Sequence, residues 1–180
     1  MRGHLPASLM HLAGRLPLLP LEIVVRRLVG NALAARPSLL ARLGEHAAGR
    51  FAIDPVDCPF AFLIAPRAID GPVRVVRSLD DATYDARIAA PLIVLVGLLD
   101  GSYDGDALFF SRDLVIEGDT EAVLALRNAI ENAGLDPSTV AGLPAGLHSS
   151  FNRATGAALS ELRRVLGAPE PTILNDDIAR

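Results

Sequence analysis

The chain has 180 residues, of which 51% are hydrophobic and 4% aromatic, with a formal net charge of −4 and one cysteine. This length predicts one domain with appendages, and the single cysteine excludes an intramolecular disulfide, which fits a reducing cytoplasm. No run of 18 or more apolar residues occurs, so we expect a cytoplasmic protein, soluble or peripheral at the inner membrane, without a spanning helix.

The first quarter of the chain is basic. Residues 1–50 contain seven Arg and two Glu, a net charge of +5, whereas the remaining 130 residues carry −9. A basic segment on an acidic body either meets anionic lipid or an acidic partner, or docks on its own domain, and the sequence leaves both open. We assign residues 1–49 to a basic helical N-terminal extension, with Arg15, Arg26 and Arg27 as candidate residues for docking to a membrane or partner.

The extension contains two predicted helices. Apolar residues recur at helical spacing over residues 20–35, with Pro20 in the first turn and Pro37 after the end. An amphipathic helix of this kind lies on a membrane or packs on its own domain. A shorter helix is predicted over residues 38–48.

From residue 51 the pattern changes to runs typical of strands. Turns rich in Asp, Pro and Gly separate four predicted strands, at residues 51–53, 60–64, 73–77 and 83–90. With a fifth strand at 113–117, the pattern predicts a five-stranded sheet, and the short connections favour antiparallel neighbours.

Residues 91–100 are apolar on every side. We interpret them as a helix that begins at Pro91 and ends before Gly101, and that is either fully buried or lines an apolar cavity. The β-branched residues in this segment leave a buried strand as the alternative. The following turn matches part of an EF-hand calcium loop, but Ser111 stands where that loop needs a bidentate Glu, so a polar turn is favoured.

The clearest local signals follow the fifth strand. Gly118 makes a turn, Asp119 is a good N-cap, and Gly134 suits the end of a helix over residues 119–134. Leu114 and Ile116 project to one face of the strand, which we expect to be the inner face.

The C-terminal part begins with a Gly- and Pro-rich link at residues 142–146. A last helix is predicted from Ser149 or Ser150 to about residue 166, followed by a loosely ordered tail at residues 168–180.

Catalytic chemistry is not indicated. The chain has no G-x-S-x-G, P-loop, G-x-G-x-x-G, H-E-x-x-H or paired-cysteine motif. Cys58 has no neighbour that would lower its pKa, and the four His are scattered, so we predict no enzyme, no metal site and no cofactor. Helix capping explains Glu117 and Asp119 better than acid–base catalysis does.

The run LFFSRDLVIEGDTE, residues 108–121, carries a family resemblance. Together with Asp106 and Ala107 it resembles the hallmark of the sterol carrier protein type 2 (SCP2) domain. More closely it is similar to the bacterial UbiT subfamily, accessory lipid carriers of oxygen-independent ubiquinone biosynthesis. The resemblance is sharp over residues 104–131 and looser over 60–166. One departure is Arg112-Asp113, where the general domain usually has Gly-Lys.

The resemblance implies an α/β (α+β) fold with a five-stranded, mostly antiparallel sheet covered by helices on one face. The lipid-binding domain would span residues 50–167, with a hydrophobic tunnel between the layers and the last helix as a lid. The residues implied to line the tunnel are Phe60, Phe62, Ile64, Leu92, Val96, Leu99, Phe109, Phe110, Leu114, Ile116, Val123, Leu126 and Ile130.

The resemblance also implies a function. The chain would hold a prenylated quinone precursor for separate iron–sulfur hydroxylases of the UbiU and UbiV type, with transient membrane contact and without binding nucleic acid. A general lipid or fatty-acyl carrier, and a scaffold with a dry core, remain alternatives.

Overall fold

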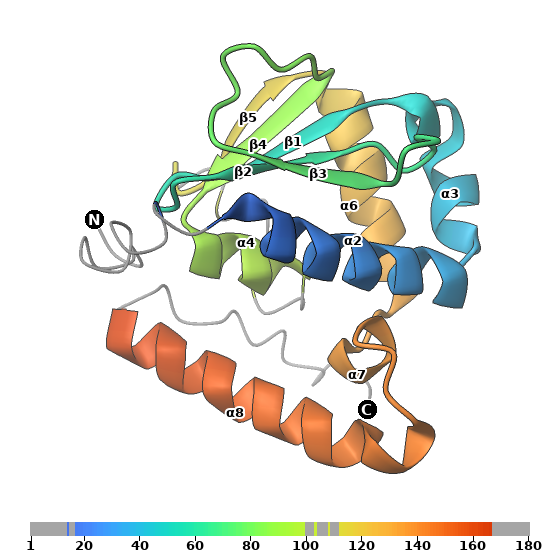
Figure 1. Ribbon diagram of the computed structural model, residues 1–180, viewed down its shortest axis with the longest axis vertical. Coiled ribbons are helices and arrows are strands. Elements are labelled where there is room, and N and C mark those ends of the chain that lie inside the picture. The colour runs from blue at the N-terminus through green and yellow to red at the C-terminus, as the bar shows by residue number, and fades with distance from the viewer. Residues whose placement is uncertain (1–13, 15–16, 100–102, 104–107, 109–111, 167–180) are drawn as a thin grey trace, which may run out of the picture.

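The computed structural model describes residues 14, 17–99, 103, 108 and 112–166. In this part of the chain, five strands form one sheet in the order β3-β2-β1-β4-β5. The strands are β1 (Phe51–Pro55), β2 (Ala61–Ile64), β3 (Val73–Val76), β4 (Ala86–Ala90) and β5 (Val115–Gly118). The helices α2 (Leu18–Ala35), α4 (Leu92–Leu99), α6 (Thr120–Ala133) and α8 (His148–Leu166) lie on one side of it, with α8 farthest away (Figure 1). This confirms the predicted fold class.

One pairing corrects the expectation of antiparallel neighbours. β1 and β4 are parallel, whereas β1–β2, β2–β3 and β4–β5 are antiparallel. Residues 77–85 carry the chain from the edge strand β3 past β2 and β1 to β4. This crossover makes β4 run in the same direction as β1. The short connection between β3 and β4 therefore does not form a hairpin.

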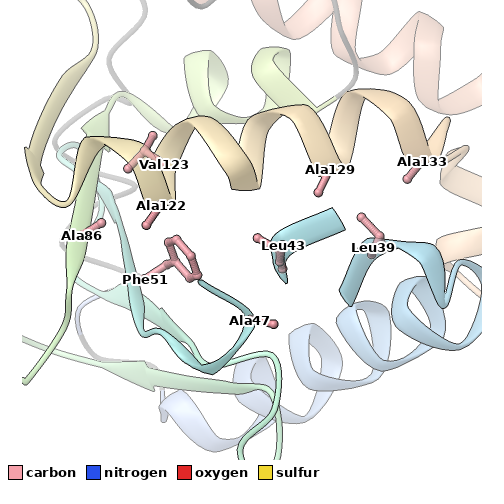
Figure 2. Close-up of a cluster of buried hydrophobic side chains, with 9 residues drawn as sticks. All are labelled: Leu39, Leu43, Ala47, Phe51, Ala86, Ala122, Val123, Ala129 and Ala133. Atoms are coloured by element: carbon pink, nitrogen blue, oxygen red, sulfur yellow. The ribbon is translucent and has the colours of Figure 1, made fainter. Parts of the chain in front are cut away.

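The first buried cluster joins α6 to the short helix α3 (Ser38–Leu43) and the 3-10 turn η1 (Gly44–Ala48). Phe51, only 1% exposed, points between α6 and these two elements (Figure 2). The small side chains Ala129 and Ala133 of α6 face α3, which lets the helix backbones approach closely. Gly44, with φ of 56°, ends α3 and splits the single helix predicted over residues 38–48.

The caps of α6 are as predicted. Asp119 Oδ1 accepts a hydrogen bond from the Ala122 N–H at 3.0 Å, and Gly134 closes the helix in the left-handed conformation. Gly118 is required at the turn before it, since a Cβ there would lie 2.2 Å from the carbonyl oxygen of Asp85.

α4 is a helix, so the alternative of a buried strand is wrong. Asp57, which is 2% exposed, accepts a hydrogen bond from the Leu92 N–H at 2.7 Å and so caps the first turn. The buried residues of α4 form a second cluster with Tyr103, Leu108 and Leu114.

α2 packs against β3 and the short helix α7 (Pro137–Val140). Glu22 Oε2 accepts from the Val75 N–H at 2.9 Å, and Arg26 donates to the Val73 and Asp70 carbonyl oxygens at 3.2 and 2.8 Å. At the other end of α2, Asn31 donates to the Val140 carbonyl oxygen at 3.0 Å. The helix therefore packs on its own domain, one of the two outcomes that the sequence left open.

The boundary at residue 50 between extension and domain stays a prediction, although residues on both sides of it share one core. No helix within residues 17–99 or 112–166 is long and apolar enough to span a bilayer.

Candidate apolar binding site

A row of four large apolar side chains crosses the middle of the inner face of the sheet. Phe62 pairs with Ile53, Ile53 with Ile88, and Ile88 with Ile116, so these side chains are direct neighbours on four adjacent strands. All four are only half-buried. We refer to Phe62, Ile53, Ile88 and Ile116 as the inner row.

The inner row lies between two fully buried regions. On one side Phe51 and Ala86 are 1% and 0% exposed, and on the other Ala90 is 2% exposed and Pro55 is buried. Ile88 and Ile116 border both buried clusters. The helices therefore close the inner face at both ends of the strands and leave its middle partly open.

This opening has an energetic meaning. Fully burying a side chain of this size is worth about 1.5–3 kcal/mol, so the part of each residue that stays exposed leaves at most about 1 kcal/mol unrealised. Covering of these four residues by an apolar ligand is therefore favourable, by a few kcal/mol at most. Chemically, the row can bind a hydrocarbon chain or ring, but it offers no group for catalysis.

Two helices present further half-buried apolar residues. Leu126 and Ile130 lie one turn apart on α6, and Leu92 and Val96 lie one turn apart on α4. Ile130, Leu92 and Val96 belong to neither buried cluster of the described residues. Together with Phe62, Ile64, Ile116 and Leu126, they are the predicted tunnel residues that are half-buried, and their contact with a ligand stays a prediction.

Other predicted tunnel residues lie elsewhere. Leu114 and Val123 are 6% and 7% exposed and belong to the dry clusters. Leu99 is 58% exposed at the end of α4. Phe109 and Phe110 lie outside the described residues, so their role stays a prediction.

Ile53 and Ile88 are the two members of the inner row that the sequence analysis missed. Each lies in a predicted strand and alternates correctly with its neighbours. Only the parallel pairing of β1 with β4 places them side by side, and that pairing links residues 35 positions apart.

The candidate docking residues have different environments. Arg26 is held by Glu22, Val73 and Asp70, so it stabilises the packing of α2 within the domain. Arg27 is exposed. The same outer side of α2 exposes three large apolar residues, namely Leu19 (66%), Ile23 (59%) and Val24 (54%). Arg15 lies outside the described residues.

The opposite face of the sheet carries a network of charged side chains. Arg87 donates to Asp54 through Nε at 3.0 Å and to Glu117 through Nη1 at 2.8 Å, and these hydrogen bonds raise the pKa of the guanidinium. Beside this network lies a surface cleft of about 500 Å³, lined in part by Phe60 and Cys58. Phe60 also contacts the ring of Phe62 edge-on, with the ring centroids 5.5 Å apart.

Burial, with a smaller effect from Asp57, raises the pKa of the Cys58 thiol to about 12. The thiol is therefore protonated at neutral pH and a poor nucleophile. Within the described residues, no three His, Cys, Asp or Glu side chains are grouped so as to hold a metal ion. A second hollow, of about 340 Å³, lies between α3 and α6, with Arg42 and Leu124 in its lining, and is separate from the inner row.

Comparison with protein families decides what kind of fold surrounds the inner row. The model of the SCP-2 sterol transfer family matches residues 31–131, which include all five strands and most of α6. The chain belongs to the SCP-2 sterol transfer family. Membership places it among lipid carriers, and the inner row lies within the matched segment. The match begins inside α2 and includes all of α3.

One of the solved structures that are similar to this chain shares its fold. The structure titled "UbiJ-SCP2 Ubiquinone synthesis protein" superposes with a TM-score of 0.53 at 21% identity, covering 68% of this chain and 99% of that chain. The apo sterol carrier protein 2 from Yarrowia lipolytica gives a TM-score of 0.44 at 16% identity, covering 61% and 89%. Comparison with curated proteins gives no significant match.

Proposed function

We propose that this chain is a carrier of prenylated quinone precursors in oxygen-independent ubiquinone biosynthesis. The inner row carries the proposal, because it is an apolar surface of four strands left partly open inside a lipid-carrier fold. The quinone class is supported by the UbiT-like run at residues 108–121 and by the ubiquinone-synthesis title of the similar structure. Proteins of the UbiU and UbiV type would then be the partners that carry out the hydroxylation.

The energetics of transfer limit how such a carrier selects its cargo. Moving a prenyl tail out of water gains about 0.8 kcal/mol per methylene group. In a cell the competing medium is the bilayer, which is as apolar as the protein site, so tail transfer itself gains almost nothing. Selectivity therefore depends on the ring end of the ligand, on the shape of the site, or on contacts with partner enzymes.

Lipid extraction from the purified chain, followed by mass spectrometry, tests the cargo directly. Co-purified prenylated phenols support the proposal. A mixture of acyl lipids would support the general lipid carrier, which the family description also favours. A ligand-free protein that takes up neither class would support a scaffold with a dry core.

Matched substitutions in β5 test whether the lipid binds at the inner row. Ile116 and Val115 are neighbours, but Ile116 lies in the inner row, whereas Val115 is 45% exposed on the opposite face. Ile116→Trp should fill the opening and lower bound lipid about tenfold, a change of roughly 1.4 kcal/mol. Val115→Trp should leave the lipid content unchanged. Equal lipid content in the two variants would remove the inner row as the binding site.

Loading requires contact with a membrane, and we propose the outer side of α2 for this contact. Exposed Leu19, Ile23 and Val24 would enter the interface, and Arg27 would meet anionic headgroups. Arg27→Glu should reduce flotation with anionic vesicles, whereas Arg153→Glu, at an exposed position of α8, should not. Arg26 is left unchanged because it stabilises the domain. Unchanged flotation of Arg27→Glu would contradict this docking surface.

A further inference from the structure

The turn between β2 and β3 carries the most exposed large apolar side chain of the described residues. Ile69 is 106% exposed, and its neighbours Arg67 and Asp70 are exposed as well. We call residues 65–72 the β2–β3 tip. Single exposed apolar residues are common on protein surfaces, so the surroundings of Ile69 decide whether it has a role.

Hydrogen bonds within the β2–β3 tip fix its backbone. The Ala65 N–H donates to the Pro72 carbonyl oxygen at 3.0 Å, and the Ala68 N–H donates to the Ala65 carbonyl oxygen at 2.9 Å. The Gly71 N–H donates to the Ala68 carbonyl oxygen at 3.3 Å. The turn therefore holds Ile69 outward in a defined position. A tip whose backbone groups are already hydrogen-bonded also loses less when it moves from water into a lipid interface.

The β2–β3 tip is joined to α2, which lies along β3 (Figure 1). Arg26 donates to the carbonyl oxygens of Asp70 at 2.8 Å and Val73 at 3.2 Å. Each helical residue advances by about 100°, so Ile23 and Arg27 lie about 60° and 100° round α2 from Arg26, in the same direction. Both are exposed. The β2–β3 tip and the outer side of α2 therefore adjoin at Arg26 and form one continuous surface.

This surface is basic, although residues 51–180 together carry a net charge of −9. Within the described part of the chain, three of its exposed arginines form no ion pair, namely Arg27, Arg67 and Arg74. Glu22 is neutralised by Arg26 at 2.9 Å, and Asp70 leaves a local net charge of +2. Such a surface is complementary in charge to anionic lipid headgroups. A projecting apolar tip fits into the hydrocarbon of a bilayer better than onto a polar protein surface.

We propose that the β2–β3 tip inserts Ile69 into an anionic lipid bilayer, with Arg67 and Arg74 binding headgroups beside it. This inference rests on the proposed loading from a membrane and adds a second contact to the outer side of α2. A helix that lies alone in an interface can rotate about its axis. A second contact beside the helix fixes the orientation of the whole domain on the membrane.

Tryptophan fluorescence of the full chain tests the insertion, because the wild-type chain contains no Trp. Ile69→Trp places a single reporter on the β2–β3 tip. Val56→Trp is the matched control, since Val56 is 48% exposed in the turn at the opposite end of β2. With vesicles of equal parts phosphatidylglycerol and phosphatidylcholine, the emission of Ile69→Trp should shift to shorter wavelength and be quenched by brominated acyl chains. The emission of Val56→Trp should not change, and circular dichroism checks that both variants are folded.

Flotation with the same vesicles gives the second test. Ile69→Ser should weaken binding about tenfold, a change of roughly 1.4 kcal/mol, whereas Val56→Ser should leave it unchanged. The double variant Arg67→Gln/Arg74→Gln should weaken binding at least tenfold at low salt, because each arginine near an anionic surface contributes to the attraction. Arg153→Gln, at an exposed position of α8, should have little effect.

Three results would overturn the proposal. The first is a wild-type chain that does not bind anionic vesicles. The second is a chain that floats with these vesicles while the emission of Ile69→Trp stays unchanged, which would confine the contact to α2. The third is an equal shift at positions 56 and 69. Lipid extraction measures the cargo separately, so a failure of tip insertion is distinguishable from a failure of the proposed function.

Discussion

Two glycines within helices should respond differently to the same substitution. Replacing Gly with Ala in a helix interior normally stabilises it by about 1 kcal/mol. At Gly30 of α2, an added Cβ would meet no atom within 4 Å, so Gly30→Ala should show this full gain. At Gly97 of α4, the added Cβ would lie 2.1 Å from Cδ2 and 2.4 Å from Cε2 of the Tyr103 ring.

The structure also sets the size of the effect. Tyr103 is 6% exposed, so its ring has little room to retreat from an added methyl group. Overpacking of this kind costs about 1–3 kcal/mol, which offsets or exceeds the helix gain and separates the two variants by a similar amount. Urea unfolding followed by circular dichroism measures both free energies of unfolding. If both variants were stabilised equally, the packing of Tyr103 against α4 would be refuted.

A related readout comes from hydrogen exchange. The Arg163 guanidinium lies over the Tyr103 ring, so displacing the ring in Gly97→Ala should loosen the C-terminal half of α8. Amides of α8 should then exchange faster in Gly97→Ala and at the wild-type rate in Gly30→Ala. Unchanged exchange in both variants would mean that α8 does not depend on the position of this ring.

Three further predictions concern charged and titrating groups. Arg26→Ala should lower the free energy of unfolding by about 1–2 kcal/mol, because Arg26 bonds the carbonyl oxygen of Asp70, before β3, and that of Val73, at its start, whereas exposed Arg27→Ala should change it little; equal effects would contradict this assignment. Cys58 should react slowly with a thiol reagent at pH 8 and rapidly once the chain is unfolded, because its pKa of about 12 falls to the ordinary value; fast reaction of the folded chain would contradict its burial. Hydrogen bonds from Ser138, Thr139 and Asn152 hold the pKa of Asp136 well below its usual range. The stabilisation that ionised Asp136 gives to the folded chain is therefore complete at neutral pH and is lost as the pH falls below about 4. The stability difference between wild type and Asp136→Asn should therefore shrink between pH 6 and pH 2, and a constant difference would contradict it.

Helix ends were predictable because their causes are local. Asp119, Ala122 and Gly134 lie within one short segment, and the preference of Asp for capping and of Gly for the left-handed conformation does not depend on distant contacts. Gly44 could have been used in the same way to end α3, since the residue type alone suggests a positive φ.

Strand partners were less predictable. The alternation in β1 and β4 indicates which residues share a face of each strand, but it does not say which strands are adjacent. Ile53 and Ile88 become neighbours only through a crossover that the short turns before β4 did not suggest. For the same reason, the sequence could not separate the open residues Phe62 and Ile116 from the buried Leu114 and Val123.

The role of Arg26 could not be predicted from the positions of the charged residues along the helix. Arg26 and Arg27 are adjacent and both appear outside the apolar stripe of the predicted helix. A long arginine side chain can reach around the helix to carbonyl groups of a neighbouring loop, and only the position of residues 70–73 decides that Arg26 does so.

The packing of α2 along β3 has a consequence for folding in the cell. An uncovered outer strand exposes a line of unpaired amide and carbonyl groups that invites pairing with another chain. Glu22 and Arg26 occupy such groups on β3, and α2 leaves the ribosome before β3 is made. α2, which covers the edge of β3, is thus synthesised before β3 itself. A chain shortened to begin after residue 35 should therefore aggregate through β3.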